Sequence, residues 1–109
     1  MRLSTLTLTS RDLLRSRAFH TMKLGFKLID ELSGKCFVVD AGGVNLRIDA
    51  EGARSPLAAA EPRLVFESKG LAERCMLLRD LGVSVEGPRN GRAELSDPDG
   101  HPITLVEMN

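Results

Sequence analysis

The sequence predicts an α+β fold made of two βαβββ modules, and three observations lead to this prediction. Alternating strand patterns surround one amphipathic helical pattern in each half of the 109-residue chain. Both helical patterns end in the same way, at Leu24-Gly25-Phe26 and at Leu81-Gly82-Val83. A turn signal at Asp97-Pro98-Asp99-Gly100 leads directly into a last alternating strand. The predicted organisation is one domain with a module at 1–52, a linker at 53–61 and a module at 62–109.

The first module is predicted to open with a half-buried strand. Residues 3–9 alternate apolar and hydroxyl side chains, so we expect Leu6 and Leu8 to point inward. Ser10 is the expected N-cap of a helix over residues 11–23, because its hydroxyl can accept a hydrogen bond from the first helical turn.

The buried stripe of this helix is predicted from apolar residues that recur at every fourth position, with arginines opposite. Gly25 should end the helix in the left-handed conformation. The predicted stripe comprises Leu13, Leu14, Ala18, Phe19 and Met22. The remaining strands of the module are expected at 26–32, 35–40 and 44–49, with a glycine turn at 41–43.

The same pattern starts again after residues 52–61, which show no strand periodicity. Arg63 should open a strand that ends at Glu67, with Ser68 as the cap of the second helix. That helix is expected over 69–81, with Leu71, Cys75 and Leu78 facing inward. Three more strands are expected at 83–86, 92–96 and 102–107.

The composition argues against several classes of partner. Fifteen basic residues balance fifteen acidic ones, so no field of one sign would hold the chain on nucleic acid or on an anionic membrane. No apolar run approaches the roughly 20 residues of a spanning helix, and the first residues enter a strand pattern rather than a signal peptide. We expect a soluble cytoplasmic protein in which Cys36 and Cys75 are buried free thiols.

The C-terminal turn resembles the closing hairpin of the vicinal oxygen chelate superfamily, which includes glyoxalase I, extradiol dioxygenases, fosfomycin-resistance enzymes and bleomycin-resistance binding proteins. Arg11-Asp12-Leu13, Ala18-Phe19-His20 and Leu24-Gly25-Phe26 also match the opening of that family at compatible spacing. The resemblance covers essentially the whole chain. It implies the glyoxalase/bleomycin-resistance fold, in which eight strands form a concave cleft and the helices lie outside.

The resemblance also implies where a divalent metal ion would bind, on the first strand of each module and on the last strand. These positions fall on Thr5, Arg63 and Thr104 in this sequence. Threonine hydroxyls are weak neutral donors, and an arginine is protonated and would repel the ion. We therefore predict no metal site and no cofactor.

The other titratable side chains do not suggest a substitute catalytic site, and no catalytic residue is predicted. The candidates are His20, His101, Asp97, Asp99 and the pair formed by Arg63 and Glu67. The histidines are interpreted as a helix-surface residue and a turn residue. The aspartates are interpreted as turn-capping residues, and the pair as an ordinary ion pair between neighbours on one strand face.

The cleft is predicted to be rich in hydroxyl groups with one or two guanidinium groups. If the apolar residues of each strand pack under the helices, the alternate residues must face the cleft. Such a lining suits an anionic or carbonyl-bearing small molecule. The alternative is a set of solvated outer-face residues. The predicted ligand-binding residues are Thr5, Thr7, Asn45, Arg47, Arg63, Glu67 and Thr104.

We predict a metal-independent small-molecule-binding protein of the glyoxalase/bleomycin-resistance type, with a role in resistance or sequestration. Two alternatives remain open at this stage. One is a lyase, isomerase or dioxygenase-like enzyme of the same superfamily, and the other is a structural or regulatory dimer without a ligand. The edge strands of each small sheet and the zero net charge also favour a homodimer.

Overall fold

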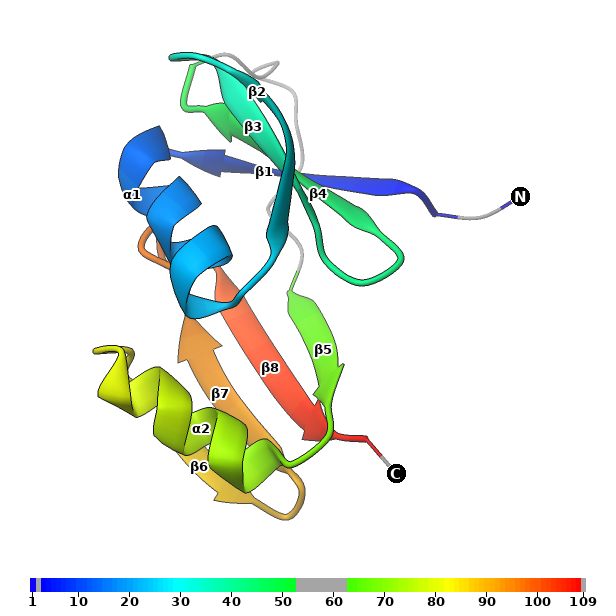
Figure 1. Cartoon of the computed structure of the whole chain (residues 1–109), viewed down its shortest axis with the longest axis vertical. Coiled ribbons are helices and arrows are strands. Elements are labelled where there is room, and N and C mark those ends of the chain that lie inside the picture. The colour runs from blue at the N-terminus through cyan, green and yellow to red at the C-terminus, as the bar shows by residue number, and fades with distance from the viewer. Residues whose placement is uncertain (2, 53–62, 109) are drawn as a thin grey trace. The chain divides into compact units, whose positions relative to one another are not determined.

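A computed structural model describes residues 1, 3–52 and 63–108, in two compact units that comprise Met1–Pro62 and Arg63–Asn109 (Figure 1). The predicted linker at 53–61 lies outside the described residues. The first unit contains β1 (Thr5–Ser10), α1 (Leu13–Ala18), a π-helical segment η1 (Phe19–Lys23), β2 (Lys27–Leu32), β3 (Cys36–Asp40) and β4 (Asn45–Ala50). The second contains β5 (Leu64–Ser68), α2 (Leu71–Asp80), β6 (Glu86–Arg89), β7 (Arg92–Ser96) and β8 (Pro102–Glu107).

Both units have the same sheet topology, which confirms the two predicted βαβββ modules. The strand orders are β1-β4-β3-β2 and β5-β8-β7-β6. In each sheet the first strand of the module pairs in parallel with the last, and the other neighbours are antiparallel. The two modules are therefore a structural repeat.

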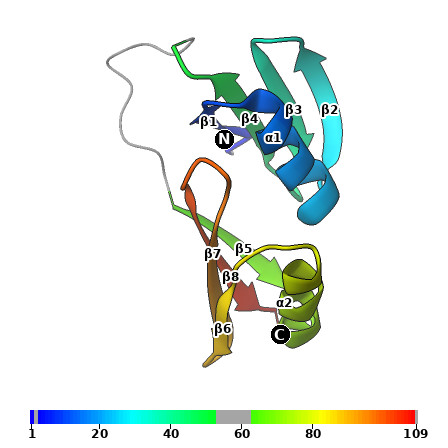
Figure 2. The ribbon, with the colours of Figure 1, turned by 90° about the vertical axis from the view of Figure 1, so that its left-hand side faces the viewer.

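Each sheet has its core on the side of its own helix (Figure 2). In the first unit α1 packs against β3 and β4, where alternate strand residues are buried. In the second unit α2 packs against β6, β7 and β8. The buried apolar strand residues are Leu8, Phe37, Val39, Leu46 and Ile48 in the first sheet, and Leu64, Ala93, Leu95, Ile103 and Leu105 in the second.

The first helix begins two residues later than the sequence suggested. Ser10 belongs to β1, and its hydroxyl oxygen accepts a hydrogen bond from the amide of Asp12 at 3.1 Å. Asp12 is the N-cap, because its Oδ1 accepts a bond from the Arg15 amide at 3.1 Å. The prediction of Ser10 as the cap was wrong because an aspartate two residues later can cap the same turn.

The predicted buried stripe of the first helix was wrong at Leu14 and Met22, although Phe19 is buried as predicted. Leu14 and Met22 are 69% and 75% exposed, whereas Ser16, Phe19 and His20 are buried. The helix therefore buries a face that includes polar residues. Within the continuous helix formed by α1 and η1, residues 16, 19 and 20 share this face by their spacing of three and four.

His20 is a core residue, which corrects its interpretation as a surface histidine. Its side chain is fully buried, and Nδ1 donates a hydrogen bond to the Ser16 carbonyl oxygen at 2.8 Å. The ring lies 5.2 Å from that of Phe19, 6.5 Å from that of Phe26 and 6.1 Å from that of Phe37, measured between centroids. The hydrogen bond satisfies one ring nitrogen, which allows the imidazole to be buried among aromatic side chains.

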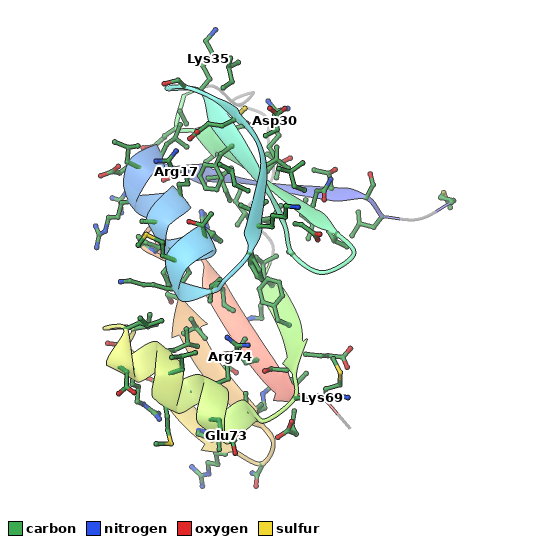
Figure 3. All side chains as sticks on the ribbon, in the orientation of Figure 1. Arg17, Asp30, Lys35, Lys69, Glu73 and Arg74 are labelled. Atoms are coloured by element: carbon green, nitrogen blue, oxygen red, sulfur yellow. The ribbon has the colours of Figure 1, made fainter. Side chains whose placement is uncertain are left out.

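Ion pairing holds the first helix to the edge strand of its sheet. Arg17 donates two hydrogen bonds from one nitrogen to the carboxylate of Glu31 on β2, at 2.9 and 2.7 Å. Figure 3 shows Arg17 on the helix, with Asp30 on β2 and Lys35 in the turn after it. The pair is about one-third exposed on each side, so we expect it to contribute at most about 1 kcal/mol.

The second helix starts after a glycine rather than after the predicted serine. Ser68 is the last residue of β5, and Gly70 is the N-cap with a φ of 62°. The free amide of Leu71 donates to the Glu107 carboxylate at 3.2 Å, so a residue 36 positions away supplies the missing cap. Lys69, Glu73 and Arg74 surround this start of the helix (Figure 3). Leu71, Cys75 and Leu78 are buried, as predicted.

The strand predicted at 83–86 is displaced to Glu86–Arg89. Gly82, with a φ of 88°, ends the helix, and the Val83 amide then donates to the Leu78 carbonyl oxygen at 2.9 Å. This bond turns Val83 into the core, where it is 8% exposed. The alternating pattern Val83-Ser84-Val85 therefore marks the end of a helix, followed by a buried apolar residue, and not a strand.

The described residues contain no helix that is long and apolar enough to span a membrane. Cys36 and Cys75 are both free thiols, as predicted; Cys75 is buried and Cys36 is only half-buried.

Candidate functional site

The second sheet has one face covered by α2 and an opposite face that α2 does not cover, which we call the open face (Figures 1 and 2). Side chains alternate along each strand, so the residues between the buried ones point to the open face. The open face comprises Val65 and Glu67 from β5, Arg92, Glu94 and Ser96 from β7, Pro102, Thr104 and Val106 from β8, and Arg63 just before β5.

The register of the strands brings Glu94 and Thr104 side by side. Glu94 is the partner of Thr104 between β7 and β8, and Thr104 is in turn the partner of Val65 between β8 and β5. The turn between β7 and β8 sets this register. Oδ1 of Asp97 accepts hydrogen bonds from the amides of Asp99 and His101, both at 2.9 Å. The predicted turn-capping role of Asp97 is therefore confirmed.

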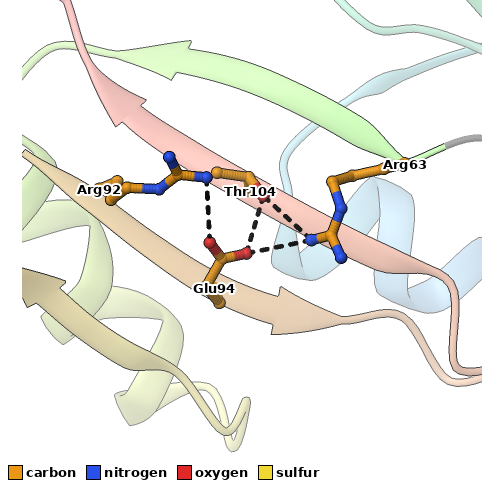
Figure 4. Close-up of polar contacts among 4 residues, drawn as sticks. All are labelled: Arg63, Arg92, Glu94 and Thr104. Carbon is orange, nitrogen blue, oxygen red and sulfur yellow. Dashed lines mark hydrogen bonds and ion pairs between the residues drawn. The ribbon is translucent and has the colours of Figure 1, made fainter.

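Four side chains on the open face form one polar network (Figure 4). The Thr104 hydroxyl donates to Glu94 Oε2 at 2.7 Å. Arg63 Nη1 lies 3.4 Å from the same carboxylate oxygen and 3.4 Å from the Thr104 hydroxyl. Arg92 Nη2 lies 3.3 Å from the other carboxylate oxygen of Glu94. The network therefore places one carboxylate between two guanidinium groups.

The network changes the acidity of its carboxylate. The hydrogen bond from Thr104 lowers the pKa of Glu94, and the charges of Arg92 and Arg63 act in the same direction. Desolvation opposes them and is outweighed. Glu94 is therefore ionised at neutral pH, and the three charged side chains together carry a net charge of +1.

The guanidinium groups keep donors available for a ligand. The side chains of Arg63 and Arg92 are 57% and 58% exposed, whereas Thr104 is fully buried. A guanidinium has five N–H donors, and the network uses only a part of them. Exposed, partly fixed guanidinium groups can bind a carboxylate, a phosphate or a polarised carbonyl group.

The structure places the predicted cleft residues in two groups. Arg63 and Thr104 lie in the network, and Glu67 is exposed on the same open face, but Arg63 pairs with Glu94 rather than with Glu67. The other predicted residues share one face of the first sheet, opposite α1. There Thr5 is the partner of Asn45 and Thr7 the partner of Arg47, and Arg47 Nε donates to Asp49 at 2.7 Å.

Arg92 and Glu94 were not predicted as site residues, although the sequence contains a signal for them. Both alternate with the apolar residues Ala93 and Leu95 on β7. Counting backward and forward from the Asp97 turn pairs Ser96 with Pro102 and so Glu94 with Thr104. The predicted turn therefore implies the strand register that places the Glu94 carboxylate next to Thr104.

The residues at the expected metal positions do not fit a divalent cation. On the second sheet the Thr104 hydroxyl donates a hydrogen bond to Glu94, and the Arg63 guanidinium lies 3.4 Å from that hydroxyl oxygen. A cation at this place would meet a positive charge and an oxygen already engaged as a donor. On the first sheet Thr5 offers only a neutral hydroxyl.

No protein-family model matches this chain. No curated protein matches it by sequence. Solved structures match it closely in fold. Lactoylglutathione lyase from Agrobacterium tumefaciens has a TM-score of 0.82 and 18% identity, over 97% of this chain and 92% of that one. TnmS3, an antibiotic binding protein from Streptomyces sp. CB03234, has a TM-score of 0.82 and 22% identity, over 100% and 97%. An integron cassette protein from V. Cholerae has a TM-score of 0.82 and 24% identity, over 100% and 96%. These likenesses show the glyoxalase/bleomycin-resistance fold.

Proposed function

We propose that this chain, which has the fold of a lactoylglutathione lyase and of an antibiotic binding protein, is a small-molecule-binding protein that works without a metal ion. Its ligand carries an anionic or carbonyl group that contacts Arg63 and Arg92 on the open face of the second sheet. Its role is resistance or sequestration in the cytoplasm. The observation that carries the proposal is the pair of exposed guanidinium groups around Glu94 and Thr104.

The face of the first sheet that carries Thr5, Thr7, Asn45 and Arg47 is proposed by itself as a second ligand-binding surface. It offers hydroxyl and amide groups that can form hydrogen bonds with a small molecule. Glu67 adds a carboxylate to the open face of the second sheet. A binding function requires these groups to be accessible, and none of the four residues on the first sheet is buried.

A thermal-shift screen over carboxylates, phosphates and aromatic antibiotics tests the proposal. A ligand that binds only the native state stabilises it by about 2.7 kcal/mol at a concentration 100 times its Kd. We expect stabilisation by compounds with an anionic or carbonyl group. A screen in which no such compound raises the Tm would favour the alternative of a structural or regulatory dimer without a ligand.

We predict that the purified protein contains no stoichiometric transition metal, because Thr5, Arg63 and Thr104 occupy the expected ligand positions. Elemental analysis after extensive dialysis measures this. The likeness to a lactoylglutathione lyase keeps an enzymatic alternative open, and metal content distinguishes it from metal-independent binding. One tightly held manganese, iron, nickel or zinc ion per chain would contradict the prediction.

We further propose that the protein is a homodimer. All six residues of β2 are exposed, and β2 is an edge strand of the first sheet. Leu28, Ile29 and Leu32 thus combine exposed apolar side chains with backbone groups at a sheet edge. Light scattering at micromolar concentration should give twice the chain mass of 11.9 kDa. A persistent single-chain mass would show that this edge stays uncovered.

A further inference from the structure

The carboxylate of Glu94 has one close partner and two distant ones. Its bond with the Thr104 hydroxyl is 2.7 Å long, whereas its distances to Arg63 and Arg92 are 3.4 and 3.3 Å. Charge-assisted hydrogen bonds from a guanidinium are normally about 2.7–2.9 Å long. Thr104 therefore anchors Glu94, while the two arginines are held only loosely beside it.

We propose that Glu94 is an internal competitor for these two arginines, and that the ligand group recognised on the open face is a carboxylate. This inference rests on the function proposed above. The ligand carboxylate would accept N–H donors of Arg63 and Arg92 and would weaken their attraction to Glu94. The loose distances make such an exchange of partners possible without breaking the bond between Glu94 and Thr104.

The charge of the network formed by Arg63, Arg92, Glu94 and Thr104 favours a monoanion. Two guanidinium groups and one carboxylate leave a net charge of +1, which one ligand carboxylate neutralises. A phosphate monoester carries about two negative charges at neutral pH, so one of them would remain beside Glu94 without a matching cation. Like charges at close range oppose binding, and the geometry of a guanidinium fork matches a planar carboxylate.

An apolar side chain next to the network indicates what else the ligand can carry. Val65 is the partner of Thr104 on β5 and is 59% exposed on the open face. A ligand whose carboxylate lies at the arginines can place an apolar body on this side chain. Benzoate has both parts and is a suitable probe; benzamide is its neutral counterpart, and phenyl phosphate is the dianionic one.

Titrating each probe into isotope-labelled protein, and following backbone amide shifts in solution, tests the inference. We expect benzoate to shift the amides of Arg63, Val65, Arg92 and Thr104, and to bind more tightly than benzamide or phenyl phosphate. The variant Glu94→Gln should bind benzoate roughly tenfold more tightly, because it removes the competing charge. Glutamine keeps an oxygen that can accept the Thr104 hydroxyl, so the fold should be retained.

The matched control is Glu73→Gln, which makes the same change of charge on α2, the helix that covers the other face of the sheet. It should leave benzoate affinity unchanged.

If Arg63→Ala weakens benzoate binding but Glu94→Gln does not tighten it, the competitor role of Glu94 is wrong and the proposed binding function stands. Preference for phenyl phosphate, or no benzoate shifts in either wild type or Glu94→Gln, overturns the assignment of a carboxylate. Equal benzoate affinity of wild type and Arg63→Ala overturns the proposed binding site at Arg63, on which the proposed function rests.

Discussion

Replacing Arg63 by alanine is expected to weaken binding of a ligand from the thermal-shift screen by about 2 kcal/mol or more, which corresponds to roughly 30-fold in Kd. The reason is the loss of charge-assisted hydrogen bonds from an exposed guanidinium that already lies 3.4 Å from Glu94 and Thr104. Isothermal titration calorimetry of the wild type and the variant measures the effect.

Folding should change much less than binding in this variant. Arg63 lies before β5 and its side chain is more than half exposed, so its ion pair contributes little to stability. Arg74→Ala, on α2, removes the same charge away from the open face and serves as the matched control. An unaltered dissociation constant in Arg63→Ala would place the binding site elsewhere.

Replacing His20 by alanine is expected to destabilise the first module by about 3 kcal/mol. The change removes a fully buried ring that contacts three phenylalanine rings, and it leaves the Ser16 carbonyl oxygen without its 2.8 Å bond. Loss of buried aromatic volume and loss of a buried hydrogen bond both contribute to this figure. Urea denaturation followed by circular dichroism measures the free energy of unfolding.

Met22→Ala is the control for this experiment, because it shortens a side chain two residues away that is largely exposed. Its free energy of unfolding should lie within about 0.5 kcal/mol of the wild type. The sequence alone predicted the reverse, with Met22 in the core and His20 on the surface. If Met22→Ala greatly lowered the free energy of unfolding and His20→Ala left it unchanged, the sequence-based assignment of the helix face would be correct.

The sequence by itself determined the architecture and the positions of the helix ends and of the last turn. Gly25 and Gly82 have positive φ angles at the two helix ends, and the Asp97 turn joins antiparallel strands, as their residue types predicted. These signals are local, since each depends on the backbone preferences of a few neighbouring residues. The alternation of apolar residues along β1, β3, β4, β5, β7 and β8 is local in the same sense.

Only the tertiary structure decided which face of the first helix is buried and which polar groups meet. Burial of Ser16 and His20 depends on rings and a carbonyl group that folding brings together, and hydrophobicity alone favoured Leu14 and Met22. Likewise, the cap of α2 comes from Glu107, which is close to Leu71 only because β8 pairs with β5. The network of Arg63, Arg92, Glu94 and Thr104 draws on three segments of the second module. Its geometry follows from the strand register. The register is a long-range property, because it can be deduced from the residue types only when it is known which strands pair.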